Sequence, residues 1–226
     1  MSAASRAPQR SSSATGVCDT GARAARVRPP RARARRRAAL TAGAAVAALL
    51  LTACGSGGTS GGGGNTNFVT GTDGISTAPK GERAAAPELS GKTLGGEHLD
   101  VADFQGKVVV LNMWGSWCNP CRAEAKYFAK VSEEYADQGV QFVGINTRDG
   151  TVGSALAFEK DFGITYPSLY DPMGKLMLRF EKGTLNPQAV PSTLILDRDG
   201  GIAARSLSPL SEERLLKMLK PVLAEK

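Results

Sequence analysis

The stretch LNMWGSWCNPCRAEAK, residues 111–126, places Cys118 and Cys121 three positions apart between two different hydrophobic patterns. Before it, VVVLNM at 108–113 is a continuous run of β-branched and apolar residues, which is typical of a strand buried on both faces. After it, apolar residues recur every three or four positions through 118–137, which predicts a helix. The two cysteines therefore lie where a buried strand ends and a helix begins.

This position favours reversible thiol chemistry over a structural disulfide. Side chains three residues apart at a helix start lie ~5–6 Å apart, so a disulfide can form and break with little backbone movement. Such a bond closes almost no loop and adds little stability. The free N–H groups of the helix N-terminus favour a thiolate at the first cysteine and lower its pKa. We therefore expect Cys118 to be the attacking nucleophile and Cys121 the resolving thiol.

A metal or haem site is the competing interpretation of the two cysteines. Zinc takes four ligands, and the part of the chain after residue 54 adds to the pair only one histidine, His98, in a polar, turn-like stretch. Arg122 stands where a c-type haem attachment motif has histidine. A copper carrier would need a further His or Met ligand near the thiols. We expect no metal and no cofactor.

Strands and helices alternate through residues 87–226, the predicted folded domain. Strands are predicted at 140–146 and 167–171, helices at 152–162 and from a Ser211 cap through Leu223, one or two helical turns at 175–180, and a hairpin where STLILD and IAARSL flank DRDGG. This order indicates an α/β fold with a central mixed sheet, flanked by helices and closed by an antiparallel edge.

Residues 1–53 have the pattern of an export signal. A cationic run at 31–37 precedes fourteen apolar-leaning residues at 38–51, fewer than the ~20 that a membrane-spanning helix needs. The sequence LTAC at 51–54 then resembles a bacterial lipobox, which predicts cleavage before Cys54 and lipidation of that cysteine. A secretory signal cut at small residues, with Cys54 incidental, remains the alternative. Export by the Sec or the twin-arginine route is left open.

The charge and composition of the remaining chain separate a tether from the domain. Residues 1–54 hold ten of the 28 basic residues and one of the 21 acidic ones, so the rest has a net charge of about −2. This balance does not support nucleic-acid binding, which needs a basic patch on the folded part. The Gly- and Ser-rich composition of 54–86 predicts a flexible tether between a lipid anchor and the domain.

Two motifs carry a resemblance to a known family. WGSWCNPC at 114–121 is similar to the thioredoxin-fold active-site motif, and together with VPSTLILDRDG downstream it resembles the TlpA/ResA branch of thiol-disulfide oxidoreductases. The resemblance covers about residues 88–226. It implies a thioredoxin-like fold with a helix-strand insertion within 147–187.

The resemblance also implies roles for individual residues. Glu124 matches the active-site glutamate of this branch, and a partly buried glutamate one turn from a thiol could exchange its proton. A carboxylate that only suits the helix dipole is the alternative. Pro191 matches the cis-proline that faces the cysteines, with the Val190 backbone offered to the substrate. Trp117 is expected to contribute to substrate binding.

The expected function is that of a thiol-disulfide oxidoreductase on the outer face of the bacterial cytoplasmic membrane, held there by its lipid anchor. The expected partners are disulfides of exported proteins such as apocytochrome c, and a membrane thiol donor that re-reduces the enzyme. The alternatives are a disulfide-forming oxidant and a metal- or haem-handling chaperone without turnover.

Overall fold

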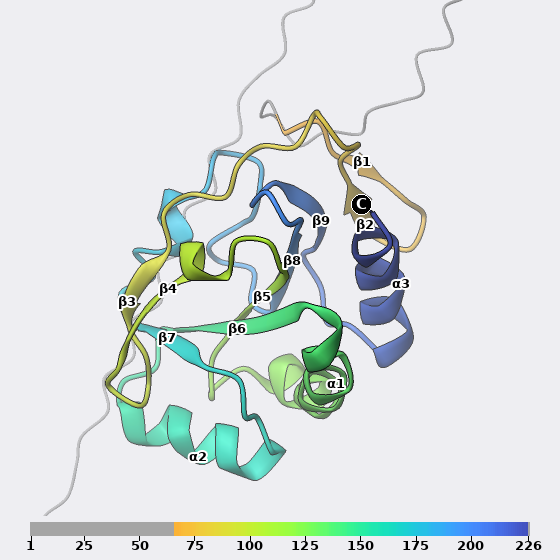
Figure 1. The fold of residues 1–226 in the computed structure, drawn as a ribbon. Helices are drawn as coiled ribbons and strands as arrows, with labels where there is room; N and C mark the ends of the chain where they lie inside the picture. Colours follow the sequence, from red (N-terminus) through yellow and green to blue (C-terminus); the bar gives the residue numbers. More distant parts are fainter. Residues whose placement is uncertain (1–65, 226) are drawn as a thin grey trace, which may run out of the picture. The chain divides into compact units, whose positions relative to one another are not determined.

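The protein folds around a seven-stranded mixed sheet (Figure 1). The computed structural model describes residues 66–225, so Cys54, the predicted signal and the first part of the predicted tether, up to residue 65, lie outside the described residues. In spatial order the strands are β1 (Val69–Thr70), β2 (Ile75–Thr77), β9 (Ile202–Ser206), β8 (Ser192–Leu196), β5 (Val108–Trp114), β6 (Val140–Thr147) and β7 (Ser168–Asp171). β5, β6 and β7 run parallel, and the other neighbours are antiparallel, which confirms the predicted mixed α/β architecture.

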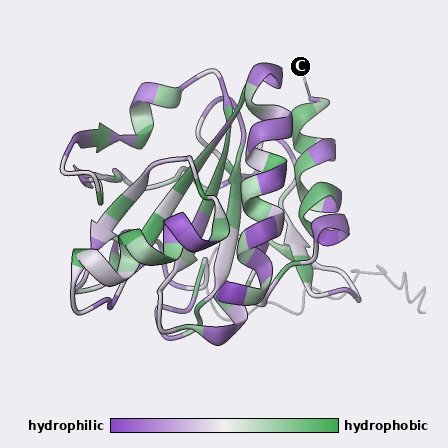
Figure 2. Cartoon of the chain, turned by 90° about the horizontal axis from the view of Figure 1, so that it is seen from below, coloured by the Kyte–Doolittle hydropathy of each residue, from purple (hydrophilic) through white to green (hydrophobic). Residues whose placement is uncertain are grey.

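Helices and a small hairpin cover the sheet. The helices are α1 (Asn119–Tyr135), α2 (Val152–Phe162) and α3 (Glu212–Leu223), with 3-10 turns η1 (Val101–Phe104), η2 (Ala136–Gln138) and η3 (Met177–Arg179); β3 (Ser90–Lys92) and β4 (His98–Asp100) form the hairpin. Apolar side chains from α1 and α3 share one core cluster with strand residues, whereas β4, η1 and η3 contribute to another. Figure 2 shows the central strands largely in hydrophobic colours and the helices with mixed faces.

The alternation of side chains along β5 explains why the sheet is buried on both faces. Val108 and Val110 belong to the cluster under α1 and α3, while Val109, Leu111 and Met113 belong to the cluster on the opposite face. Successive strand residues point to opposite faces, so a run that is apolar at every position but Asn112 can fill both cores. The continuous apolar pattern thus sets this strand at the centre of the sheet.

The predicted boundary of the tether at residue 86 is wrong. β1 and β2 lie within it, and β2 pairs with β9 and extends the sheet. Phe68, Ile75 and Ala78 are buried in the two core clusters. A few well-placed apolar residues, together with backbone pairing to an existing edge, order a stretch whose average composition predicts a flexible chain.

The other predicted elements agree closely with the structure. α2 has the predicted bounds, and the Ser211 hydroxyl caps α3 by accepting a hydrogen bond from the Arg214 amide. The helical turn predicted at 175–180 is η3. The β3–β4 hairpin was missed because its strands have only three residues each, and His98, placed by the sequence in a turn, is an exposed residue of β4.

The parallel strands bring their carboxyl ends to one edge. β5 ends at Trp114, β6 at Thr147 and β7 at Asp171, and β8 begins there at Ser192 because it runs antiparallel to β5. The two cysteines follow β5, and Pro191 precedes β8. One edge therefore gathers the motifs that lie more than 70 residues apart in the sequence.

Candidate active site

The cysteine pair lies at the first turn of α1. Cys118 is the N-cap residue, and Pro120 occupies the first turn, where a missing N–H costs little. Cys118 and Cys121 are joined by a disulfide with a Cα–Cα distance of 5.3 Å. The Cys121 amide donates to the Cys118 Sγ at 3.2 Å, so a backbone N–H of the helix start already faces the sulfur that would carry negative charge. This geometry supports a reactive thiolate at Cys118.

The loop before β8 faces the disulfide from across the edge. The Val190–Pro191 peptide bond is cis, as the resemblance predicts. The Val190 carbonyl oxygen lies 3.6 Å from the Cys118 Sγ. Cys118 is only 3% exposed, so a reacting group has to approach it beside this loop. The backbone of Val190 therefore lies where a bound polypeptide could pair with it.

Glu124 is buried one helical turn beyond Cys121. Its side chain is 2% exposed, and burial raises the pKa of its carboxyl to about 7, although hydrogen bonds from the Leu210 amide and Asn112 oppose this shift. The Leu210 N–H donates to Oε2 at 2.8 Å, and the Asn112 Nδ2 donates to Oε1 at 3.0 Å. A carboxyl with a pKa near 7 can take up or release a proton at neutral pH.

The two tryptophans of the motif have different surroundings. Trp114 is buried, stacks on Phe158 at 4.5 Å between ring centroids, and donates its indole N–H to the Ser168 hydroxyl. It is a core residue. Trp117 is 48% exposed beside Cys118, and its indole N–H donates to the Thr147 carbonyl oxygen at 3.2 Å. Trp117 is thus an apolar surface held in place next to the disulfide.

Sequence reasoning missed Asp149, which holds the turn before the cysteines. Its carboxylate accepts hydrogen bonds from the Ser116 amide at 2.9 Å, from the Ser116 hydroxyl and from the Asn146 side chain at 2.6 Å. The signal was present, since a polar residue just after a buried parallel strand lies at the edge where ligands and reactive groups gather. Nothing in the local sequence links it to Ser116, which is 33 residues away.

A metal site finds no support in the described residues. Residues 66–225 contain no group of three or more His, Cys, Asp or Glu side chains arranged to hold a metal ion. The only histidine of the chain, His98, is exposed on β4.

None of the helices in 66–225 is long and apolar enough to span a bilayer.

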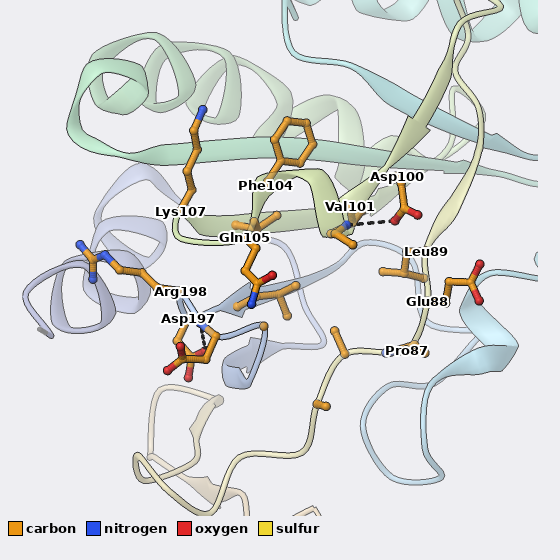
Figure 3. A pocket seen from close by; sticks show the side chains of 17 residues that line it. Pro87, Glu88, Leu89, Asp100, Val101, Phe104, Gln105, Lys107, Asp197 and Arg198 are labelled. Carbon is orange, nitrogen blue, oxygen red and sulfur yellow. Dashed lines mark hydrogen bonds between the residues drawn. The ribbon is translucent and has the colours of Figure 1, made fainter.

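A pocket of about 320 Å³ lies at the other end of β5, away from the cysteines (Figure 3). It is formed by residues 85–89, η1 and the turn between β8 and β9, and its lining includes Leu89, Val101 and Val109. No cysteine lines it. It is therefore separate from the candidate active site.

The chain is similar in sequence to known thiol-disulfide oxidoreductases. The Redoxin family model matches residues 79–219. The thiol-disulfide oxidoreductase ResA of Geobacillus kaustophilus is 28% identical over 159 residues, which cover 69% of this chain and 85% of ResA. Thioredoxin-like protein YneN of Bacillus subtilis is 32% identical over 139 residues, covering 61% and 78% of the two chains.

Solved structures show the same similarity. A DsbF homologue from Corynebacterium diphtheriae is 37% identical with a TM-score of 0.63, and the match covers 70% of this chain and 99% of the homologue. A secreted thiol-disulfide isomerase from Corynebacterium glutamicum is 31% identical with a TM-score of 0.63, covering 72% and 100%. These matches confirm the predicted thioredoxin-like fold and the resemblance to the ResA group.

Proposed function

Because the chain belongs to the Redoxin family and is a thiol-disulfide oxidoreductase, we propose that it works outside the cytoplasm as a tethered reductant of protein disulfides. The observation that carries this proposal is the Cys118–Cys121 pair at the start of α1, facing the Val190 carbonyl. Exported proteins with a CxxC thiol pair, such as apocytochrome c, are the proposed substrates.

The proposed reaction is a two-step dithiol exchange. The Cys118 thiolate attacks one sulfur of a substrate disulfide, which breaks the S–S bond, releases a substrate thiolate and leaves a mixed disulfide. The Cys121 thiolate then attacks Cys118, the second substrate thiol leaves, and the enzyme disulfide forms. Two electrons have passed to the substrate, and a membrane dithiol donor returns two electrons to the enzyme. Trp117, Val190 and Pro191 would contact the substrate.

Glu124 is proposed to exchange a proton with the thiol pair. Its pKa near 7 and its place one turn from Cys121 support this role. Its negative charge would disfavour a nearby thiolate, so Glu124→Gln should lower the pKa of Cys118. Titration of the thiol by absorbance measures this pKa, and an unchanged value would leave Glu124 without a role in proton exchange.

The location outside the cytoplasm is proposed from the first 54 residues. We propose that residues 1–53 are removed as a signal peptide, that Cys54 is lipidated, and that a tether continuing to about residue 65 connects it to the folded domain. Labelled fatty acid should be incorporated into the wild-type protein. The Cys54→Ala variant should instead be released into the medium or keep its signal peptide. A mature N-terminus elsewhere, without lipid, would refute the anchor.

The second candidate function is disulfide formation, in which electrons pass from substrate thiols to the Cys118–Cys121 disulfide. It stays open because the Corynebacterium glutamicum relative is described as a secreted thiol-disulfide isomerase and not as a reductant. The reductant should have a potential near the thioredoxin value of ~−270 mV, and a strong oxidant one near ~−120 mV. Equilibration of the Cys118–Cys121 couple against glutathione or dithiothreitol measures this potential and separates the two.

Insulin reduction with a dithiol donor tests the reaction itself. The wild-type protein should accelerate it, and Cys121→Ser should accumulate a mixed disulfide with the substrate that gel electrophoresis without reductant detects. An enzyme that accelerates insulin reduction equally well without Cys118 would refute the proposed mechanism.

A further inference from the structure

We propose that three consecutive residues at the end of β6, Thr147, Arg148 and Asp149, form a clamp that positions the Cys118 thiol by holding the turn before it. This inference rests on the proposed role of Cys118 as the nucleophile. It assigns positioning roles, above all to Asp149, and the comparisons with known proteins name none of these residues.

Each residue of the clamp holds a different part of the turn. The Thr147 carbonyl oxygen accepts the indole N–H of Trp117 at 3.2 Å. The Arg148 guanidinium lies over the Trp117 ring, 4.6 Å from its centroid. The Asp149 carboxylate accepts both the amide and the hydroxyl of Ser116. The two residues immediately before Cys118 are therefore fixed from one side.

The backbone of the clamp is shaped for this task. Arg148 has a φ of 58°, in the left-handed region that non-glycine residues rarely adopt. Such a conformation persists only where surrounding contacts hold it. It lies between Thr147, the last residue of β6, and Asp149, so the chain turns sharply just where both neighbours contact the turn.

Asp149 is itself held firmly and without a cation. It is 4% exposed. Its Oδ2 also accepts a hydrogen bond from the side-chain amide of Asn146 at 2.6 Å, and its backbone carbonyl accepts one from the Tyr170 hydroxyl at 3.4 Å. Within residues 66–225 no Lys or Arg forms an ion pair with it. A buried carboxylate bound by neutral donors makes strong hydrogen bonds and fixes their geometry.

The clamp affects reactivity by fixing the position of the Cys118 Sγ at the N-terminus of α1. The Cys118 amide donates to the Gly115 carbonyl at 3.1 Å, which closes the turn and sets Cys118 as the N-cap of α1. In the oxidised protein the disulfide also fixes this sulfur, whereas in the reduced protein the turn alone keeps the thiolate at the helix N-terminus. The clamp should therefore stabilise the thiolate and matter most in the reduced state.

The test is the pKa of Cys118 in Asp149→Asn, because positioning and direct charge predict opposite signs. A loosened turn removes the thiolate from the helix N–H groups, so the pKa should rise by about half a unit. Loss of a nearby negative charge would instead lower it. A rise, with a few-fold loss of kcat in insulin reduction and little change in KM, supports the clamp. A fall or an unchanged pKa overturns it.

Two further variants and one control keep the test independent of folding. Ser116→Ala removes one of the two bonds from Ser116 to Asp149 and should raise the pKa by a smaller amount, while Ser116→Thr keeps the hydroxyl and should restore the wild-type value. If Asp149→Asn fails to fold, this pair carries the test alone, and equal pKa values in Ser116→Ala and Ser116→Thr overturn the clamp.

The matched control is Asp171→Asn. Asp171 is an equally buried carboxylate at the end of β7, and its oxygens accept hydrogen bonds from the Lys175 and Leu176 amides instead of from the turn at 115–117. It should leave the pKa of Cys118 unchanged. The clamp is refuted separately from the function when insulin reduction still requires Cys118 but the Asp149 and Ser116 variants leave its pKa unmoved.

Discussion

The two ends of the central sheet treat buried charge in opposite ways. At the cysteine end, Glu124 and Asp149 are buried carboxylates whose hydrogen-bond donors are neutral. At the other end, the Arg83 side chain is 7% exposed and lies between Glu225, which it binds with two hydrogen bonds of 2.6 and 2.7 Å, and Asp197 at 2.8 Å. Burial without a cation leaves the Glu124 carboxyl free to change its protonation, whereas the ion pair between Arg83 and Glu225 stabilises the charged form of both groups.

The pKa shifts follow this difference. Burial raises the pKa of Glu124 to about 7, whereas the hydrogen bond from Arg83 lowers the pKa of Glu225 below its ordinary value. A group whose pKa is raised on folding contributes stability to the protein that is lost as pH rises. A group whose pKa is lowered on folding contributes stability that is lost as pH falls. The two ends should therefore respond to pH in opposite directions, and the following predictions test this contrast.

The largest effect is expected for Cys118→Ser at the cysteine end. Insulin reduction should fall by at least about three orders of magnitude, because the attacking sulfur is gone. The free energy of unfolding should match that of reduced wild type, since the ion pairs at the far end are untouched. Urea titrations of the variant and of the reduced wild type provide this comparison, and a large difference between them would show that the two ends are energetically coupled.

Glu124→Gln should remove a pH dependence of stability. The folded pKa of about 7 lies above the ordinary value of 4.5, so the protonated form stabilises the folded protein. That stability is fully present below about pH 4.5 and is lost as pH rises to about 7, a change on the order of 3 kcal/mol for this group. Urea unfolding of the oxidised proteins at pH 5 and pH 8 measures it. If the stability of wild type and variant changed equally with pH, the raised pKa of the Glu124 carboxyl would be contradicted.

Arg83→Met should destabilise the fold without changing the chemistry of the thiols. It removes the guanidinium from Asp197 and Glu225 while keeping a long side chain, at a cost of about 2 kcal/mol. The contribution from Glu225 is present at neutral pH and is lost as pH falls, so the difference from wild type should shrink in acid. The potential of the cysteine couple should stay the same, and a shifted potential would remove the distinction between the two ends.

The smallest effect is expected where a pair of charges is exposed. Lys130 and Glu212 form a 2.6 Å ion pair at the surface between α1 and α3. Solvent and salt screen such a pair, so Lys130→Ala should leave the urea midpoint and the thiol pKa unchanged. A midpoint shift as large as that of Arg83→Met would show that pairing alone, and not burial, sets the difference between the ends.

Local patterns in the sequence determined the strand, the helix start and the reactive pair. The apolar run at 108–113 needed no partner to be recognised, because a strand buried on both faces has no polar alternation. The helix period after Cys118 and the serine cap of α3 are equally local, since their hydrogen bonds join residues three or four apart. For the same reason the roles of Cys118 and Cys121 could be proposed from their spacing alone.

Tertiary structure decided which distant groups meet at that pair. The β1–β2 hairpin is ordered by pairing with β9, about 130 residues away, and composition carries no record of such a partner. Glu124 is buried because the Leu210 amide and Asn112 close around it, and Asp149 reaches Ser116 only because β5 and β6 end at the same edge. Burial and hydrogen bonding between remote segments set these charges, and neither follows from the neighbours of a residue in the sequence.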